Sequence, residues 1–311
     1  MKRDRLTRFL YPSLAGSLLV FSFCLLNQEL GRYNPEDILD SFSTIEQSQL
    51  SSALGWTIID YLIISTYDII AFFSLNHALN IKRILFTTFI TYAVSNTTGY
   101  TLLIGGGIRY RFYSLWGVTR KNIAKITALG NLTFWLGLLT LSGITFLTNP
   151  IQLPKHLNLT NSIIRYLGII ALVSVGTYLY FCWRRKCLKI RGKSICFPSL
   201  NTTLSQITIF SLDWALAAAV LYCLIPDYPG KSYFSFFSIY LLAMSTSILS
   251  TVPGGIGVFE TVIILLLPKS ISAPDILSSL LAYRAIRFLI PLGIALILLG
   301  CFELRRKLNQ S

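Results

Sequence analysis

The chain has little charge and very few histidines. Only 13% of its 311 residues are charged, about half the share found in soluble domains. The two histidines, His77 and His156, lie far apart, which argues against a histidine metal site or a serine-type triad. The sequence also has no phosphate-binding P-loop, metal-ligand cluster or nucleophile elbow. We therefore expect a protein that is not an enzyme and that uses no metal and no cofactor.

Cysteine is present without a metal-binding pattern, since the six cysteines show no paired spacing. Cys182, Cys187 and Cys196 lie in or near a basic loop that we place in the cytoplasm, where thiols stay reduced. We expect these cysteines to be small apolar or solvated thiols.

Hydrophobic residues make up 53% of the chain, and the mean hydropathy is +0.62. Apolar runs of the length that spans a bilayer predict an all-α polytopic integral membrane protein. The expected helices cover residues 9–26, 54–79, 85–104, 123–147, 163–183, 204–225, 234–267 (broken) and 282–302. The first run lacks a small-x-small cleavage site and is expected to be an uncleaved helix. Residues 38–50 suit a short amphipathic helix on the membrane surface.

The formal net charge is +14, and the basic residues cluster at the ends of apolar runs. Membrane topology and attraction to anionic lipid explain this pattern better than nucleic-acid binding does. Acidic residues gather instead after the first apolar run. The positive-inside rule then places both termini and the 184–193 loop in the cytoplasm, and the 29–46 loop outside.

Two of the apolar runs predict re-entrant hairpins rather than simple spans. Lys82-Arg83 and Arg109-Arg111 flank the same run, yet both basic pairs favour the inside. The polar stretch 95–99 interrupts that run, so we expect a hairpin that enters from the cytoplasm and returns. Residues 234–267 are expected to form a second hairpin from the opposite face. The residues assigned to the two breaks are Asn96, Gly99, Gly105, Gly106 and Gly107 in the first, and Pro253, Gly254, Gly255 and Gly257 in the second.

The two halves of the chain follow the same order. Asp68 precedes the first hairpin and Asp213 precedes the second, each in an apolar run. This predicts a single transmembrane domain over 1–311, with about six full transmembrane helices and two hairpins in an inverted-repeat arrangement. Residues 54–125 form the first repeat and 204–303 the second. Such repeats often place a substrate site near the bilayer midplane.

Seven ionisable residues in or beside apolar runs are candidates for a lipid-headgroup site, because a buried charge in a membrane is costly and often functional. Arginines beside glycine-rich breaks suit a phosphate group. They also suit positive-inside anchors or side chains that snorkel to the interface. The acids can pair with the arginines only to hold helices together, contact a cationic headgroup, or relay protons. The seven are Asp68, Arg109, Arg111, Asp213, Glu260, Arg284 and Arg287; Asp60 is a further buried acid.

Several of these motifs together resemble a known family. They are Pro253-Gly-Gly-Ile-Gly-Val-Phe-Glu260, Tyr67-Asp68, the block from Asn96 and Gly99 to Gly105-Gly-Gly-Ile-Arg109-Tyr110, and Tyr283-Arg284 before Pro291. Between about residues 54 and 302 the chain resembles the transmembrane region of bacterial lysylphosphatidylglycerol synthase/flippase proteins. The resemblance implies a bacterial inner-membrane protein that moves a modified phospholipid between leaflets. Larger members carry a soluble aminoacyltransferase domain, so aminoacyl transfer is not expected from residues 1–311.

We therefore expect a lipid transporter or flippase whose ligand is a phospholipid, anionic or aminoacylated. The alternative is a subunit that does not transport, and instead binds lipid or scaffolds a separate lipid-modifying enzyme. An intramembrane enzyme is disfavoured by the lack of a nucleophile–base pair. Nucleic acid is not expected as a partner, and a homo-oligomer stays open.

Overall fold

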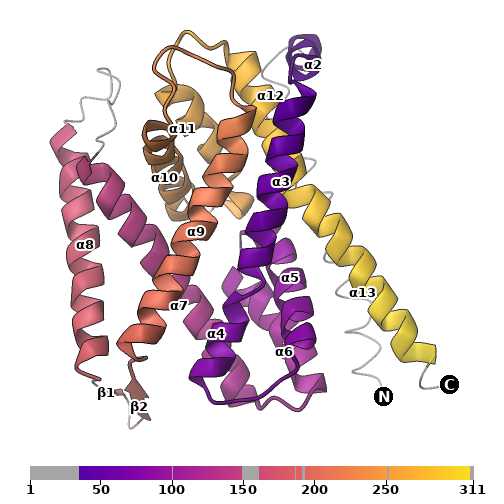
Figure 1. Cartoon of the computed structure of the whole chain (residues 1–311), viewed down its shortest axis with the longest axis vertical. Helices are drawn as coiled ribbons and strands as arrows, with labels where there is room; N and C mark the ends of the chain where they lie inside the picture. Colours follow the sequence, from indigo (N-terminus) through magenta and orange to yellow (C-terminus); the bar gives the residue numbers. More distant parts are fainter. Residues whose placement is uncertain are drawn as a thin grey trace.

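A computed structural model describes residues 35–99, 101–148, 161–185, 187–190, 193–250 and 252–308. Figure 1 shows these residues as a bundle of helices with one small β-hairpin at the lower end. The expected helix at 9–26 lies outside the described residues.

Five described helical stretches are long and apolar enough to cross a membrane. They are Gln47–Ser74, Arg120–Thr148, Ser162–Trp183, Leu200–Leu224 and Ala273–Leu308. The prediction of an all-α polytopic membrane protein is confirmed at this level. The second, third and fourth of these stretches correspond to α7 (Arg120–Thr148), α8 (Asn161–Trp183) and α9 (Leu200–Leu224).

The first described span begins earlier than predicted and is broken once. A short helix, α2 (Pro35–Ser43), precedes α3 (Gln47–Ile64), and α4 (Tyr67–Ser74) follows after a turn. Helix α3 starts at residue 47 because Glu46 and Gln49 form a capping box, in which the Glu46 N–H donates to Gln49 Oε1 at 3.0 Å. The single surface helix expected over 38–50 is therefore wrong, since the chain turns within it.

The first predicted hairpin contains α5 (Ile81–Thr98), a π-helical turn η1 (Thr101–Gly105) and α6 (Gly106–Leu115). Gly99, with φ of 77°, ends α5. Asn96 lies inside α5, Gly105 ends η1, and Gly106 and Gly107 open α6, so within this block the helix is broken at Gly99. The polar run stays helical because its hydroxyls bond within the helix, as Thr97 Oγ1 donates to the Ala93 carbonyl at 2.9 Å.

The second predicted hairpin contains α10 (Tyr233–Leu249), a 3₁₀ turn η3 (Pro253–Gly255) and α11 (Val258–Leu266). Gly254, Gly255 and Gly257 all have positive φ, between 62° and 85°. At Gly255 a side chain is also excluded by space, because a Cβ there would lie 1.6 Å from Ser247 Oγ. The glycines therefore allow the chain to reverse in a tightly packed position.

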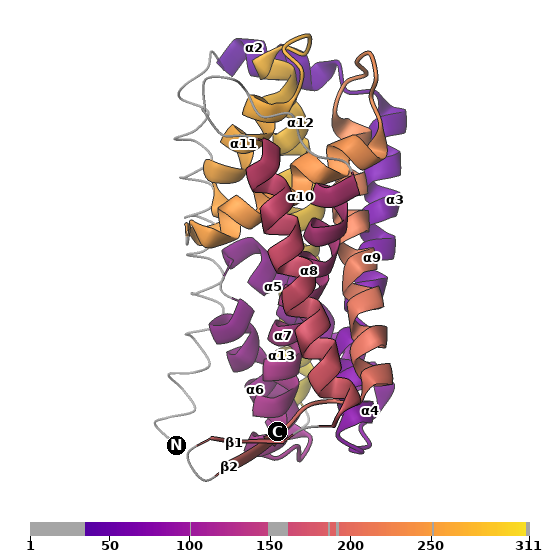
Figure 2. The same ribbon diagram turned by 90° about the vertical axis from the view of Figure 1, so that its left-hand side faces the viewer.

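The two broken segments occupy opposite halves of the molecule and meet near its middle. In both views α5 and α6 lie in the lower half, and α10 and α11 lie in the upper half (Figures 1 and 2). Their tips meet, because a Cβ on Gly254 would lie 3.1 Å from the Thr97 carbonyl oxygen. At this contact the irregular backbone of the second break is covered by protein rather than by lipid.

The last span is a continuous stretch of α12 (Ala273–Arg284), a π-helical turn η4 (Ala285–Leu289) and α13 (Ile290–Leu308). It begins nine residues before the predicted start, because the Ser272 hydroxyl caps α12 by accepting the Asp275 N–H at 3.2 Å. Arg284 and Arg287 therefore lie near the middle of a long helix and do not open it. This position disfavours their snorkelling to an interface.

The β-hairpin pairs β1 (Cys187–Ile190) with β2 (Lys193–Cys196), and places Cys187 opposite Cys196 in the antiparallel register. Cys187 is disulfide-bonded. The expectation that its thiol is reduced is therefore wrong. A free thiol is retained by Cys182, which is buried beside Thr203.

Close packing of α7 and α9 depends on a glycine. A Cβ on Gly137 would lie 2.8 Å from Phe210 Cβ, so the two backbones approach closely, as small residues permit in membrane helices. A Cβ on Gly176 in α8 would have nothing within 4 Å. The two glycines therefore form a matched pair for testing this contact.

We expect Gly137→Ala to destabilise the bundle by about 1–3 kcal/mol through overpacking against Phe210. Gly176→Ala adds the same methyl group in open space and is expected to leave stability unchanged or slightly raised. Thermal unfolding in detergent, followed by size-exclusion chromatography, compares them. Equal melting temperatures for the two variants would contradict the close α7–α9 contact.

Candidate functional site

A cavity of about 450 Å³ lies where the two broken segments meet. Its walls come from α5, η1, α7, α9, α10, η3, α11, α12 and η4, so both hairpins contribute. Most lining atoms are apolar, with a smaller set of polar groups, as is usual for ligand sites. The polar lining residues are Tyr92, Ser95, Asn96, Asn131, Asp213, Tyr240, Ser247, Tyr283, Arg284 and Arg287.

One side of the cavity reaches the protein surface. Leu102 and Leu103 in η1 line it and are 57% and 75% exposed. Trp135 on α7 and Val252 beside η3 also line it and are exposed. The rim on this side is therefore apolar, whereas the charged lining residues lie deeper.

Glu260 and Arg284 form a buried pair at the cavity wall. Arg284 Nε donates to Glu260 Oε1 at 2.5 Å. The other oxygen, Glu260 Oε2, accepts the Gly257 N–H at 2.8 Å and caps the start of α11. Glu260 thus joins the glycine break to α12. Arg284, unlike Glu260, lines the cavity.

Arg287 faces two carboxyl groups. Its Nη2 lies 2.9 Å from Asp60 Oδ2 and 3.2 Å from Asp213 Oδ1. The three residues come from α3, α9 and η4, and all are buried. Sequence reasoning recognised Asp60 as a buried acid but did not include it in the site. Its only signal was a lone acid in an apolar run, which does not identify the partner.

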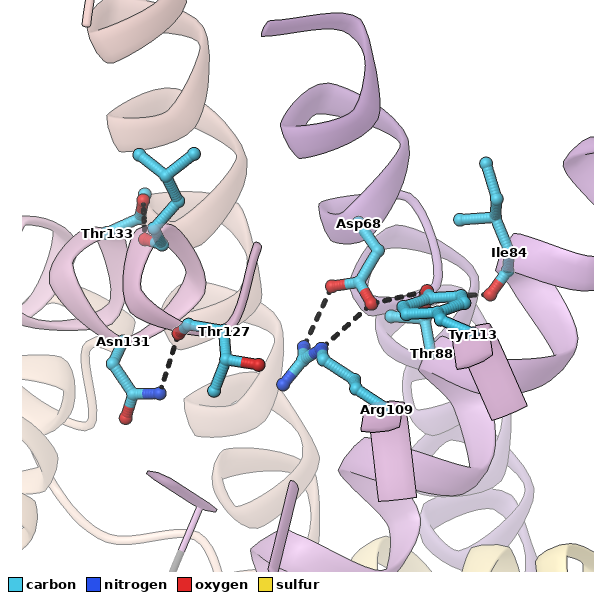
Figure 3. A network of polar contacts seen from close by, with 9 residues as sticks. Asp68, Ile84, Thr88, Arg109, Tyr113, Thr127, Asn131 and Thr133 are labelled. Carbon is cyan, nitrogen blue, oxygen red and sulfur yellow. Dashed lines mark hydrogen bonds and ion pairs between the residues drawn. The ribbon is translucent and has the colours of Figure 1, made fainter. Parts of the chain in front are cut away.

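Asp68 and Arg109 form a third buried arrangement, shown in Figure 3. Arg109 donates from Nε and Nη2 to the two Asp68 oxygens at 2.9 and 2.8 Å, a bidentate geometry. The Tyr113 hydroxyl donates to the same carboxylate at 2.6 Å. Sequence reasoning gave Tyr113 no role in the site. Arg109 is fully buried behind the Tyr92 ring and does not line the cavity.

Arg111 also lies outside the cavity lining. It pairs with Glu303 near the end of α13. Of the four predicted arginines, the fold thus brings Arg284 and Arg287 to the cavity and uses Arg109 and Arg111 to join helices. Within the described ranges, no group of three or more His, Cys, Asp and Glu residues is placed to hold a metal ion.

Long apolar helices, buried ion pairs and a cavity between two helix breaks define a polytopic membrane protein with an internal polar site. The chain belongs to the family described as the lysylphosphatidylglycerol synthase TM region, whose model matches residues 13–295.

Three relatives illustrate the range of the family. An uncharacterised protein of Synechocystis sp., slr0712, is 41% identical over 96% of this chain and 95% of its own length. The inner membrane protein YbhN of Escherichia coli is 35% identical over 80% of this chain and 78% of its own. The phosphatidylglycerol lysyltransferase of Staphylococcus aureus is 27% identical over 95% of this chain, but only 34% of its own length is matched.

We expect Asp68→Asn to destabilise the protein by about 3–5 kcal/mol, because it leaves Arg109 buried without a counter-ion. Asp227→Asn is the control. Lys231 hydrogen-bonds Asp227 and lowers the pKa of this exposed carboxyl, but exposed pairs contribute little. Thermal unfolding of both variants in detergent gives the comparison. A wild-type melting temperature for Asp68→Asn would show that the pair does not hold α4 to α6.

Proposed function

We propose that the protein binds the phosphate-bearing headgroup of a phospholipid in the cavity and moves the lipid between the leaflets of a bacterial inner membrane. The single observation that carries this proposal is the pair of arginines, the buried Arg287 and the partly buried Arg284, at the wall of a cavity with an apolar open side. Phosphate is favoured because the planar guanidinium donates two parallel hydrogen bonds to its oxygens.

The open side suits a lipid in particular. Leu102 and Leu103 are exposed at the rim, so acyl chains could remain in the bilayer while only the headgroup enters. Tyr92, Ser95 and Asn96 offer further hydroxyl and amide groups inside. The desolvation of the headgroup, which is the main cost of crossing, would then be offset by these polar partners.

The names of two relatives support the proposal of a membrane phospholipid as the ligand. The enzyme from Staphylococcus aureus is a phosphatidylglycerol lysyltransferase, and YbhN is an inner membrane protein. The ligand we propose is accordingly an anionic phospholipid or its aminoacylated form. Since about a third of the lysyltransferase is matched, we propose no aminoacyl transfer by residues 1–311.

We further propose that the two broken segments are re-entrant hairpins of an inverted repeat, over 54–125 and 204–303. Their placement at opposite ends supports this (Figure 1). Charge supports it too. The start of α5, the start of α7, the β-hairpin and the end of α13 lie at one end and carry clustered Lys and Arg residues. The positive-inside rule makes that end cytoplasmic, with the C-terminus there.

Topology is tested with single cysteines in a cysteine-free background. Lys82→Cys and Lys121→Cys are expected to react with an impermeant thiol reagent only from the cytoplasmic side. Pro229→Cys and Lys269→Cys should react from outside in intact cells. All four wild-type positions are exposed, so access is not limited by burial. Labelling of positions 82 and 121 from opposite sides would contradict the first hairpin.

Transport is tested with purified protein in liposomes that carry a fluorescent phosphatidylglycerol, using a quencher of the outer leaflet. We expect Arg284→Lys to slow lipid movement by roughly ten- to hundredfold, because a charge-assisted hydrogen bond contributes about 1.5–3 kcal/mol. Arg111→Lys is the matched control, since Arg111 lies outside the cavity lining.

Three outcomes distinguish the alternatives. Slow movement in Arg284→Lys with normal movement in Arg111→Lys supports the proposal. Lipid that binds wild-type protein without moving would favour a lipid-binding or scaffold subunit. Equal rates for both variants and wild type would contradict a role for Arg284 in the site.

A further inference from the structure

The cluster of Asp60, Asp213 and Arg287 differs in charge from the other buried pairs. Asp68–Arg109 and Glu260–Arg284 each match one acid with one base. Here a single guanidinium nitrogen contacts carboxylate oxygens of both acids, at 2.9 and 3.2 Å. With both acids ionised, the cluster would carry one uncompensated negative charge in the interior, which is unfavourable. Two carboxyl groups that share a site resist joint ionisation.

The hydrogen bonding of this cluster is also incomplete. Among the described residues, neither oxygen of Asp60 accepts a hydrogen bond of good geometry, although Oδ2 lies 2.9 Å from Arg287 Nη2, and Arg287 Nε and Nη1 have no acceptor. Asp60 is 0% exposed and Arg287 is 5% exposed, so the outer surface of the bundle does not supply partners, and Arg287 faces only the cavity that it lines. In the Asp68–Arg109 pair, both carboxylate oxygens are bonded. The cluster therefore has free acceptor sites for a proton and free donors for an anion.

Other ionisable groups around the cluster are mainly phenols. They come from α3, α4, α5, α10 and α12, and their ordinary pKa is near 10. The two carboxyl groups are thus the acidic members of the cluster, and one guanidinium faces both of them. The cationic Arg284, paired with Glu260, lies at the same cavity. The phenols are Tyr61, Tyr67, Tyr92, Tyr240 and Tyr283.

We propose that Asp60 and Asp213 hold one proton between them when the cavity is empty, and take up a second when an anionic headgroup binds Arg287. This coupling rests on the proposed lipid function. An anion that engages Arg287 removes the counter-ion of the remaining carboxylate. That carboxylate then takes a proton from a hydronium ion or buffer acid of the bulk solvent, which reaches it through the cavity. One O–H or N–H bond breaks in the donor, one O–H bond forms on the carboxylate, and the charge of the anion is balanced.

The shared proton is tested without any ligand. Infrared spectra of the purified wild-type protein at neutral pH should contain the C=O stretch of a protonated carboxyl group. Either Asp60→Asn or Asp213→Asn should remove it, because the remaining acid then pairs with Arg287 one to one. Asp227→Asn is the control and should keep the band. Absence of the band from wild-type protein, or its persistence in both single variants, would overturn the shared proton.

Coupling is tested by calorimetric titration with dioctanoyl phosphatidylglycerol in two buffers of different ionisation enthalpy. Wild-type protein should take up about one proton per lipid, and affinity should rise as pH falls, by up to about tenfold per pH unit. The double variant Asp60→Asn/Asp213→Asn should bind the lipid without proton uptake. Asp227→Asn should behave as wild type.

These experiments distinguish a failure of the proton coupling from a failure of the proposed lipid function. Lipid binding with no proton uptake by wild-type protein would overturn the coupling and leave the proposed function standing. No binding of the lipid at any pH would contradict the proposed function, while the infrared band would still decide whether the two acids share a proton.

Discussion

An arginine carried into an apolar interior needs a carboxylate beside it, and three such arrangements organise this protein. Arg109 with Asp68 joins α6 to α4, and Arg284 with Glu260 joins α12 to the glycine break before α11. Arg287 joins η4 to α3 and α9 through Asp60 and Asp213. Each arrangement connects segments distant in sequence, so the cost of burying charge also fixes the fold.

The same constraint explains why the polar site lies between the two broken segments. A helix break exposes backbone groups that lipid cannot satisfy, and here the two breaks cover each other, with Gly254 against the Thr97 carbonyl. The space left between them is lined by Arg284 and Arg287 and opens past Leu102 and Leu103. The same arrangement therefore serves the fold and the site, because polar groups are concentrated where two protein segments shield them from lipid.

Much of this could be predicted from sequence, because apolar run length identifies α7, α8 and α9, and the Pro-Gly-Gly motif marks the break before α11. Helix boundaries were less predictable. Ser95 to Thr98 looked like an interruption, but hydroxyl bonds within α5 keep the helix intact to Gly99. The partner of each buried charge was least predictable, since Asp60 and Arg287 are 227 residues apart in sequence and meet only through packing.

The proposed function requires above all that the cavity hold a phospholipid headgroup. An experimental structure of the protein in nanodiscs that contain phosphatidylglycerol tests it most directly. We expect a headgroup phosphate within hydrogen-bond distance of Arg284 or Arg287, with acyl chains leaving past Leu102 and Leu103. A cavity filled only by water, with lipid confined to the outer surface of the bundle, would contradict it.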